Sequence, residues 1–291
     1  MKYIVTEELP LLEILQKMYP DSSTTSLRSW VKEDRVTVDG GSIKNVKTLI
    51  KINQEVAVNP KKKFLPYGVQ VIYDDSSVIV IQKPAGLLSV STDLEKEFTA
   101  HSSLKQYYHP RTIHVVHRLD QDTSGLMIFA LNEKAYNHFK KQFETHEISR
   151  RYCAIAEGHL SESAGTWSSY LYEDSNYIVH STKDKTLGKL ATTHYRVLGT
   201  SKQNSWLDIK LETGRKNQIR VHTREAGHPL VGDKKYGATM HTKRLYLHAY
   251  ALTFEHPDTK KIMTFKAPIP DSFYKLVNPQ GDPTCTTTKF G

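Results

Sequence analysis

The strongest constraint on the fold is a series of short apolar segments that begins near residue 70 and continues almost to the end of the chain. Val78–Ile81 and Gly125–Leu131 are apolar runs bounded by turn residues, which is typical of β-strands. Residues 132–146 instead show helical spacing, with Asn132 in position to cap the helix. Further strand signals cover residues 150–158, 191–199, 204–212, 244–254 and 261–267. Because strands outnumber helices, we predict an α+β fold with a mainly antiparallel, mixed sheet and flanking helices, rather than a doubly wound fold.

The first sixty residues have a different pattern and are predicted to form a small, separate α/β module. Apolar residues at helical spacing in Leu11–Met18 predict one helix, and the polar residues Thr24–Ser26 offer an N-cap for a second. Short strands are expected at Val36–Val38, which ends in an Asp39-Gly40 turn, and at Val56–Val58.

A run of three lysines between two prolines, Pro60 and Pro66, separates this module from the part rich in strands. The prolines interrupt regular structure and the lysines favour an exposed, extended path. We therefore predict four segments: the module at 1–60, a linker at 61–69, a larger domain at 70–280 and a flexible tail at 281–291.

The net charge of this 291-residue chain is +9, and it is unevenly distributed. Residues 1–60 are neutral overall, whereas residues 151–291 contain 20 basic and 13 acidic residues. This asymmetry favours a polyanionic partner, nucleic acid before membrane, although a solvated lysine-rich surface is the alternative. No apolar run is long enough to span a membrane, and Glu7 and Glu8 follow the N-terminus too closely for a signal peptide, so we expect a cytoplasmic protein.

Metal and disulfide chemistry is not expected from the residues present. Cys153 and Cys285 are the two cysteines, far apart in sequence, and the fourteen histidines are scattered without ligand spacing. Phosphate-binding loops, dinucleotide fingerprints and serine-hydrolase elbows are also missing from the sequence. We therefore expect neither a metal nor an organic cofactor.

The first cluster of polar residues, His117–Gly125, lies between the apolar strands expected at Ile113–Val116 and 126–131. A loop between strands lets a rigid sheet present reactive groups. Asp120 is suited to act as a nucleophile or general base, and Arg118 to steady its charge or grip a phosphate. Taken alone, the loop composition favours ordinary turn chemistry.

The second cluster, Thr213–His222, is expected to open a helix. Arg220 and Arg224 fall four residues apart on one face of this helix. Together with Arg215 and Lys216 they create a positive field suited to phosphates, and a solvated basic helix is the alternative.

Two neighbouring features add to these clusters. Gly214 is expected to permit a sharp backbone turn that aims Arg215 at a neighbour. The segment Arg150-Arg151-Tyr152 places an aromatic ring beside two arginines, which suits stacking on an RNA base. A half-buried tyrosine in a strand is the default interpretation of Tyr152.

Several of these segments occur in one order and at matching spacing, and together they resemble the RluA-type pseudouridine synthases over about residues 70–270. Asn217, where a histidine is usual, and Gln121, where a basic residue is common, depart from the family pattern. The matching segments are Lys83-Pro84-Ala85-Gly86-Leu87, His117-Arg118-Leu119-Asp120, Arg151-Tyr152, Thr213-Gly214-Arg215, Gln218-Ile219-Arg220-Val221-His222, Gly227-His228-Pro229 and Leu247-His248-Ala249.

The N-terminal pattern, over residues 12–58, resembles the alpha-L RNA-binding motif first known from ribosomal protein S-four. Arg28 and Lys32, one turn apart on a shared helix face, are then expected to contact RNA. A small packing domain with little RNA affinity is the alternative interpretation.

The resemblance to the pseudouridine synthases implies isomerisation of uridine to pseudouridine within an RNA chain. It makes large-subunit ribosomal RNA the first choice of substrate and transfer RNA the second, and we expect the protein to act as a monomer. Asp120 matches the essential aspartate, which either attacks C1′ of the sugar or removes a proton from C2′.

The resemblance also implies roles for other residues of the two clusters. Tyr152 matches the tyrosine that stacks on the base, and Arg215 is expected to form an ion pair with Asp120. Arg118 matches the residue that holds the target nucleotide out of the stack. Gln218, Arg220 and Arg224 are expected to bind RNA.

Two other functions are compatible with the residues alone. A non-catalytic RNA-binding or ribosome-assembly protein would account for the positive second half of the chain. A hydrolase acting on a glycosidic bond would need a second carboxylate opposite Asp120, for which Asp122 is the near candidate.

Overall fold

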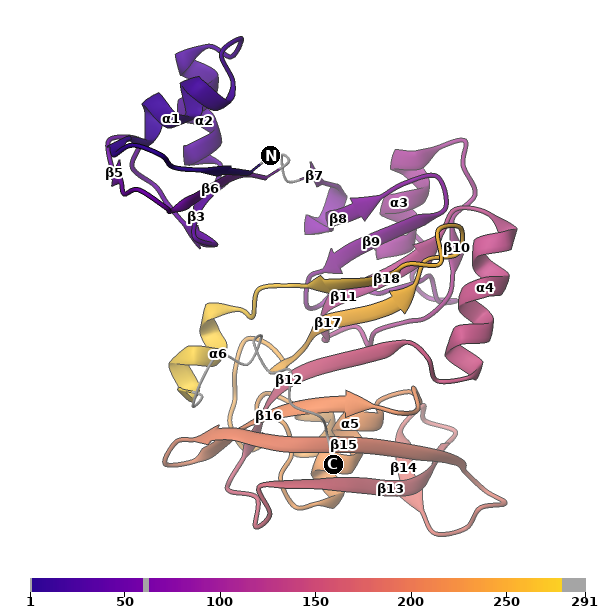
Figure 1. The fold of residues 1–291 in the computed structure, drawn as a ribbon. Helices are drawn as coiled ribbons and strands as arrows, with labels where there is room; N and C mark the ends of the chain where they lie inside the picture. Colours follow the sequence, from indigo (N-terminus) through magenta and orange to yellow (C-terminus); the bar gives the residue numbers. More distant parts are fainter. Residues whose placement is uncertain (1, 60–62, 279–291) are drawn as a thin grey trace. The chain divides into compact units, whose positions relative to one another are not determined.

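The computed structural model describes residues 2–59 and 63–278, and the chain divides into two compact units, Met1–Lys63 and Phe64–Gly291 (Figure 1). The predicted α+β class with a mainly antiparallel sheet is confirmed. The flexible tail expected at 281–291 lies outside the described residues, as does Cys285. None of the described helices is long and apolar enough to cross a membrane.

The small unit packs two helices against a short sheet with the strand order β1-β6-β3-β4. Apolar side chains of both helices, including Leu15 and Leu27, are buried against Val36 and Val56 of this sheet. The elements are β1 (Lys2–Ile4), β2 (Leu9–Pro10), α1 (Leu11–Met18), α2 (Thr24–Lys32), β3 (Val36–Val38), β4 (Gly41–Ser42), β5 (Leu49–Ile50) and β6 (Glu55–Val58).

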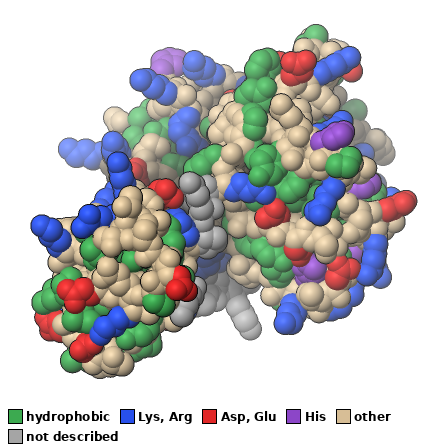
Figure 2. Space-filling view, turned by 90° about the horizontal axis from the view of Figure 1, so that it is seen from above, with side chains coloured by type: hydrophobic (Ala, Val, Ile, Leu, Met, Phe, Trp, Pro, Cys, Tyr) green, Lys and Arg blue, Asp and Glu red, His purple; other side chains and the backbone are tan. Residues whose placement is uncertain are grey.

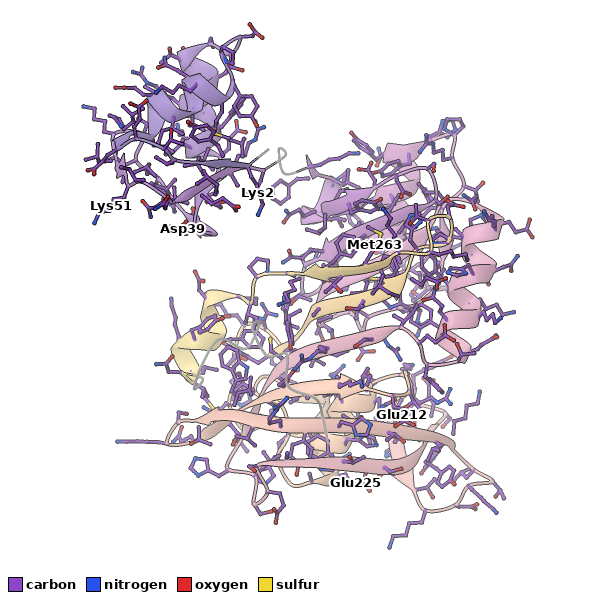
Figure 3. The ribbon with its side chains drawn as sticks, viewed as in Figure 1. Lys2, Asp39, Lys51, Glu212, Glu225 and Met263 are labelled. Carbon is purple, nitrogen blue, oxygen red and sulfur yellow. The ribbon has the colours of Figure 1, made fainter. Side chains whose placement is uncertain are left out.

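Asp39, labelled in Figure 3, fastens the turn after β3 to the start of β6. It adopts a left-handed conformation (φ 49°), and its carboxylate accepts hydrogen bonds of 2.8 Å from the backbone N–H of Glu55 and the side chain of Gln54. These two bonds lower the pKa of Asp39. The Asp39 carboxylate thus stabilises the turn that the sequence predicts.

The second helix begins one residue earlier than its predicted cap allows. Ser23 is the N-cap, and its Oγ accepts a hydrogen bond of 3.2 Å from the backbone N–H of Ser26. Thr24 and Thr25 are therefore the first helical residues rather than capping residues.

Replacing Ser23 with alanine is expected to lower the local stability of α2 by about 1 kcal/mol, because an N–H group of the first turn loses its acceptor. Thr25→Ala is the matched control, because Thr25 is an exposed residue two positions after Ser23 and alanine has the higher helix propensity. Native-state hydrogen exchange of amides 24–32 in the full chain measures both variants. Equal loss of protection in the two would contradict the assignment of Ser23 as the cap.

One large sheet runs through the second unit in the order β14-β13-β15-β16-β12-β17-β11-β9-β8-β7, with β10 paired to β11 and β18 to β17. Its strands are β7 (Lys63–Phe64), β8 (Gln70–Asp74), β9 (Val78–Lys83), β10 (His114–Val115), β11 (Ser124–Ala130), β12 (Ser149–Glu157), β13 (Ala164–Glu173), β14 (Val179–Thr182), β15 (Lys189–Thr200), β16 (Asn204–Leu211), β17 (Leu247–Glu255) and β18 (Ile262–Lys266). Its helices are α3 (Ala100–Tyr108), α4 (Glu133–Glu144), α5 (Gln218–Glu225) and α6 (Asp271–Leu276), with short 3₁₀ turns η1 (Pro66–Gly68) and η2 (Lys234–Tyr236).

Strand β17 lies between β11 and β12 although it comes much later in the chain (Figure 1). Its contact with β11 is the one parallel pairing among β8 to β18, and there Gly125 lies opposite Ala249. A Cβ at Gly125 would lie 2.2 Å from the carbonyl oxygen of Ala249, so this close crossing requires glycine. Both strands that flank β17 position a candidate catalytic residue: Asp120 lies in the loop just before β11, and Tyr152 lies on β12.

The two uninterrupted apolar runs of the sequence are explained by burial on both faces of the sheet. On β9, Ile79 and Ile81 belong to one apolar cluster, whereas Val78 and Val80 belong to another on the opposite face. Strand β11 divides its side chains between the same two clusters, and α4 covers the second of them with Phe139. Asn132 caps α4 as predicted, accepting a hydrogen bond of 2.9 Å from the N–H of Ala135.

The structure differs from the sequence-based expectation at several elements of the larger unit. Residues 64–69 were expected to be linker, but Leu65 and Val69 are buried in its main apolar cluster. The predicted elements include no counterpart of helices α3 and α6 or of strands β8, β13 and β14. Along β13 most side chains are at least partly exposed, so the strand lacks a strong apolar signal.

Candidate active site

Asp120 lies in the loop between β10 and β11, and a neighbouring segment fixes the backbone of this loop. The Ser89 hydroxyl accepts a hydrogen bond of 3.1 Å from the N–H of Leu119 and donates one of 2.6 Å to the Leu119 carbonyl. The carbonyl of Gln121 accepts a hydrogen bond of 3.0 Å from the N–H of Gly86. The loop is therefore held immediately before and after Asp120.

Lys83, at the end of β9, completes this support from inside the protein. Its fully buried ammonium group donates to the carbonyl oxygens of Pro84 (2.9 Å), Leu87 (2.6 Å) and Gln121 (2.8 Å). Burial lowers the pKa of Lys83 to about 7, against the charges of two nearby aspartates. A single lysine at the end of an apolar run is the sequence signal for this role.

Asp120 opens onto a pocket of about 370 Å³. Tyr152, Phe143 and Leu247 form part of its wall. The cationic lining residues are Arg118, Arg150, Arg215 and Lys216. Among the described residues that line it, Asp120 is the sole carboxylate, so any carboxylate chemistry in this pocket depends on Asp120.

The environment of Asp120 sets its charge. Burial raises the pKa of its carboxyl group, while the charge of Arg220, the backbone N–H of Asn217 and the charges of Arg118 and Lys83 oppose the rise. Asn217 is the left-handed N-cap of α5 (φ 54°, ψ 18°), so a backbone N–H at the start of this helix supports the carboxylate.

Arg220 is the arginine that stabilises Asp120, and it is buried rather than displayed on a basic helix face. Its Nε and Nη2 each donate a hydrogen bond of 2.7 Å to Asp233, and the two side chains are 7% and 0% exposed. Burial lowers the pKa of Arg220, but the hydrogen bonds and charge of Asp233 outweigh it and the pKa is raised. The predicted basic face of α5 is therefore wrong in part, since Arg224 alone of the pair is exposed.

Arg215 does not form the predicted ion pair with Asp120 within the described structure. Its side chain is exposed at the rim of the pocket, where its Nε donates to the carbonyl of Leu190 at 3.0 Å. Gly214 does not take a left-handed conformation, and the need for glycine there is one of space. A Cβ at Gly214 would lie 2.4 Å from Nη1 of Arg150.

Gln218 is buried and lines the pocket, and its contact with RNA stays a prediction. Its side chain accepts hydrogen bonds from Thr213 Oγ1 (2.7 Å) and the N–H of Arg215 (2.9 Å), and it donates to Thr193 Oγ1 (2.9 Å). Gln218 thus holds the turn that leads into α5.

The two departures from the family pattern have different surroundings. Asn217 is buried, and its side chain contacts Tyr236 (3.0 Å) and Arg220 (3.2 Å) rather than solvent. Gln121 is exposed and donates a hydrogen bond of 3.1 Å to the carbonyl of Gly86. Both side chains therefore support loops around Asp120.

Strand β12 directs its two arginines differently. Arg151 forms an ion pair with the buried Asp208, whereas Arg150 and Tyr152 line the pocket. Burial raises the pKa of Tyr152, Arg150 opposes the rise and Asp120 adds to it. The phenol of Tyr152 is therefore neutral, and it lies close enough to Asp120 for the charge of that carboxylate to raise its pKa.

A second hollow shares Arg118, Asp120 and Lys216 with this pocket. Its other cations are Lys234, Lys235, Lys243, Arg244 and Arg220. On the face of the molecule drawn in Figure 2, Lys and Arg are scattered among acidic and apolar side chains. Asp122 is exposed and lines this hollow rather than the pocket.

Three other predicted RNA-binding residues are not among the residues that line either hollow. Arg224, in the last turn of α5 before Glu225 (labelled in Figure 3), is exposed but lines neither hollow. Arg28 and Lys32 are exposed on α2 of the small unit, and their RNA contact stays a prediction. In the described part of the chain, no group of three or more His, Cys, Asp or Glu residues could hold a metal ion.

Comparison with known proteins gives a consistent result. The RNA pseudouridylate synthase family matches residues 77–225. A protein named ribosomal large subunit pseudouridine synthase D from Neisseria meningitidis is 35% identical over 91% of this chain and 77% of that protein, and the protein of the same name from Escherichia coli K12 is 32% identical over 91% and 88%. The solved structure of human RNA pseudouridylate synthase domain containing 1 superimposes with a TM-score of 0.59 at 26% identity, covering 72% of this chain and 88% of that one.

Proposed function

Because the chain belongs to the RNA pseudouridylate synthase family, we propose that it isomerises uridines of large-subunit ribosomal RNA and that Asp120 is the essential residue. The observation that carries the proposal is the pocket in which Asp120 is the sole carboxylate among the described lining residues. The ribosomal substrate is supported by the names of two relatives that align with 91% of the chain. We also propose that it acts as a monomer in the cytoplasm.

The reaction breaks the bond between N1 of uracil and C1′ of ribose, and the bonding electron pair leaves with the base. Asp120 either attacks C1′ or removes the C2′ proton. After the base has turned, C5 bonds to C1′ while the C1′–Asp120 bond breaks or, in the second route, the proton returns from Asp120 to C2′. C5 then loses its proton and N1 gains one. A partly buried carboxylate whose ionised form is favoured by Arg220 and the N-terminus of α5 suits either first step, because these groups oppose the rise in pKa that burial causes.

The other pocket residues would place the nucleotide. Tyr152 presents a ring on which uracil stacks, beside Asp120. Arg118 is exposed at the rim, where it would occupy the space left by a flipped nucleotide and offset a cost of a few kcal/mol. Arg215 and Lys216, also at the rim, would contact phosphates, which replaces the catalytic role first expected of Arg215.

Mapping pseudouridines in total RNA with and without the gene tests the substrate. Carbodiimide adducts detected by primer extension should disappear from one or more positions of large-subunit ribosomal RNA in the deletion strain, and a plasmid copy should restore them. Restoration by the wild type but not by Asp120→Asn would tie the loss to the active site. Losses confined to transfer RNA would overturn the proposed substrate and favour the alternative.

A further inference from the structure

Arg150 is a buried cation for which the protein provides no counter-charge. It is 9% exposed, its Nε has no hydrogen-bond partner, and none of the described carboxylates forms an ion pair with it. Its neighbour Arg151 shows the contrast, since it is neutralised by the buried Asp208. A guanidinium group carries five N–H donors and no acceptor, so a buried one without partners is poised to bind a ligand.

The surroundings of Arg150 hold it in place without satisfying it. Its guanidinium carbon lies 5.4 Å from the centre of the Phe143 ring. His117 is also close, but burial and the charge of Arg150 lower the pKa of His117 to about 3, so this imidazole is neutral. Gly214 leaves space for Nη1, which would lie 2.4 Å from a Cβ at that position. The cation is therefore packed into a fixed position in the wall of the pocket.

The position of Arg150 indicates which part of the substrate it meets. It lies two residues before Tyr152 on β12, and both side chains line the pocket. Side chains two residues apart on a strand share a face and are separated by roughly 7 Å, which is the scale of a pyrimidine ring with its carbonyl groups. Arg118 and Arg215 are exposed at the rim, where phosphates pass, whereas Arg150 is buried.

We propose that Arg150 is a catalytic residue that stabilises the uracil anion produced when the C1′–N1 bond breaks. The electron pair of that bond moves onto the base and spreads to its carbonyl oxygens, which become the acceptors that Arg150 lacks in the free protein. The base is neutral again when C5 bonds to C1′. The later loss of the C5 proton is matched by protonation of N1, so the charge balance is restored. A fixed donor aimed at charge that develops during the reaction accelerates the chemical step more than it strengthens binding.

This proposal rests on the proposed isomerase function and is tested separately from it. The probe is a 23S ribosomal RNA transcript labelled with tritium at uracil C5, with enzyme in excess. Arg150→Gln is expected to slow single-turnover tritium release by about 10²- to 10³-fold. Arg150→Lys should retain part of the rate, because it keeps the charge but loses the fixed fork of donors. Lys140→Gln is the matched control, since it removes the same charge from an exposed site on α4 and should leave the rate unchanged.

Binding and stability distinguish catalysis from other roles of Arg150. The Kd of Arg150→Gln for the transcript and its salt dependence should match those of the wild type, and its Tm should be no lower, because an unpaired buried charge has been removed. Full single-turnover rate would overturn the proposal, and so would a weaker Kd whose salt slope falls by about one, which marks a phosphate contact. Absence of tritium release from the wild type would count against the isomerase function itself.

Gly214→Ala gives a second route to the same test, because its methyl group must displace the end of Arg150 while the charge remains. It should slow tritium release, and the double variant Gly214→Ala/Arg150→Gln should be no slower than Arg150→Gln alone. Losses that add in the double variant would contradict an action through Arg150.

Discussion

Asp120→Asn is expected to lower single-turnover tritium release from C5-labelled RNA by about 10⁴-fold or more, while the variant still folds and binds RNA. Asparagine nearly preserves the shape of the side chain but removes the negative charge that either attacks C1′ or takes the C2′ proton. The pocket offers no replacement, because the other described residues that line it include no carboxylate.

Asp122→Asn is the matched control for this loss. It removes a carboxylate two residues away that is exposed and does not line the pocket, so the rate should stay close to that of the wild type. Equal release by the wild type and Asp120→Asn would refute the role of Asp120. If Asp120→Asn and Asp122→Asn lowered the rate equally, the total negative charge of the loop would matter rather than a reaction of the Asp120 carboxylate.

The pH dependence of the wild-type rate gives an independent reading of Asp120. The ionised form is required, so activity should fall as the pH drops through the pKa of this group. Burial raises that pKa above its usual value of 3.8, against the opposing charge of Arg220. The acid limb of the single-turnover profile should therefore lie at a higher pH than for a free aspartate, and a limb at or below the usual value would contradict this.

Breaking the Arg220–Asp233 pair is expected to produce the largest loss of stability, about 3–5 kcal/mol for Arg220→Met, because a buried carboxylate is left without its partner. Activity should be lost as well, since Arg220 is the foremost charge that favours ionised Asp120. Arg224→Met, on the exposed side of the same helix, is the stability control and should cost little. Urea unfolding followed by fluorescence measures the difference in free energy.

The double variant Arg220→Met/Asp233→Asn separates the two effects. It leaves no unpaired charge, and the asparagine oxygen can still accept the hydrogen bond that Asp233 receives from the N–H of Tyr236. Stability should recover in large part, whereas tritium release should stay low. Recovery of both would show that Arg220 acts only through the fold, and recovery of neither would show that the ion pair is not the source of the instability.

The sequence predicts those parts of this fold that depend on local pattern. The cap at Asn132 and the apolar strands around Val80 and Ile128 are visible because capping chemistry and side-chain burial act within a few residues. Strand β13 is missed because its partly exposed side chains give no apolar alternation, and its pairing with β14 and β15 is decided at long range.

The candidate active site also combines features that local sequence predicts with features that depend on long-range contacts. The motif predicts Asp120 as the reacting residue, but it does not predict which arginine lies near it. Arg215 and Arg220 belong to one basic segment and differ only in their tertiary partners. Arg220 is drawn inward by Asp233, thirteen residues away, whereas Arg215 stays at the surface. Strand alternation could have separated Arg150 from Arg151, since residues two apart on a strand share a face and Tyr152 was already placed at the site.

The position of β17 between β11 and β12 has a consequence for when the enzyme becomes active during its synthesis. Asp120, Tyr152 and Arg220 have all been translated before β17, yet the strand that fills the gap between their supporting strands is Leu247–Glu255. A nascent chain that ends before this segment has a sheet with two unpaired edges in its middle, which cannot hold the pocket. We therefore expect catalytic competence only after Leu247–Glu255 has been translated and has paired with β11 and β12.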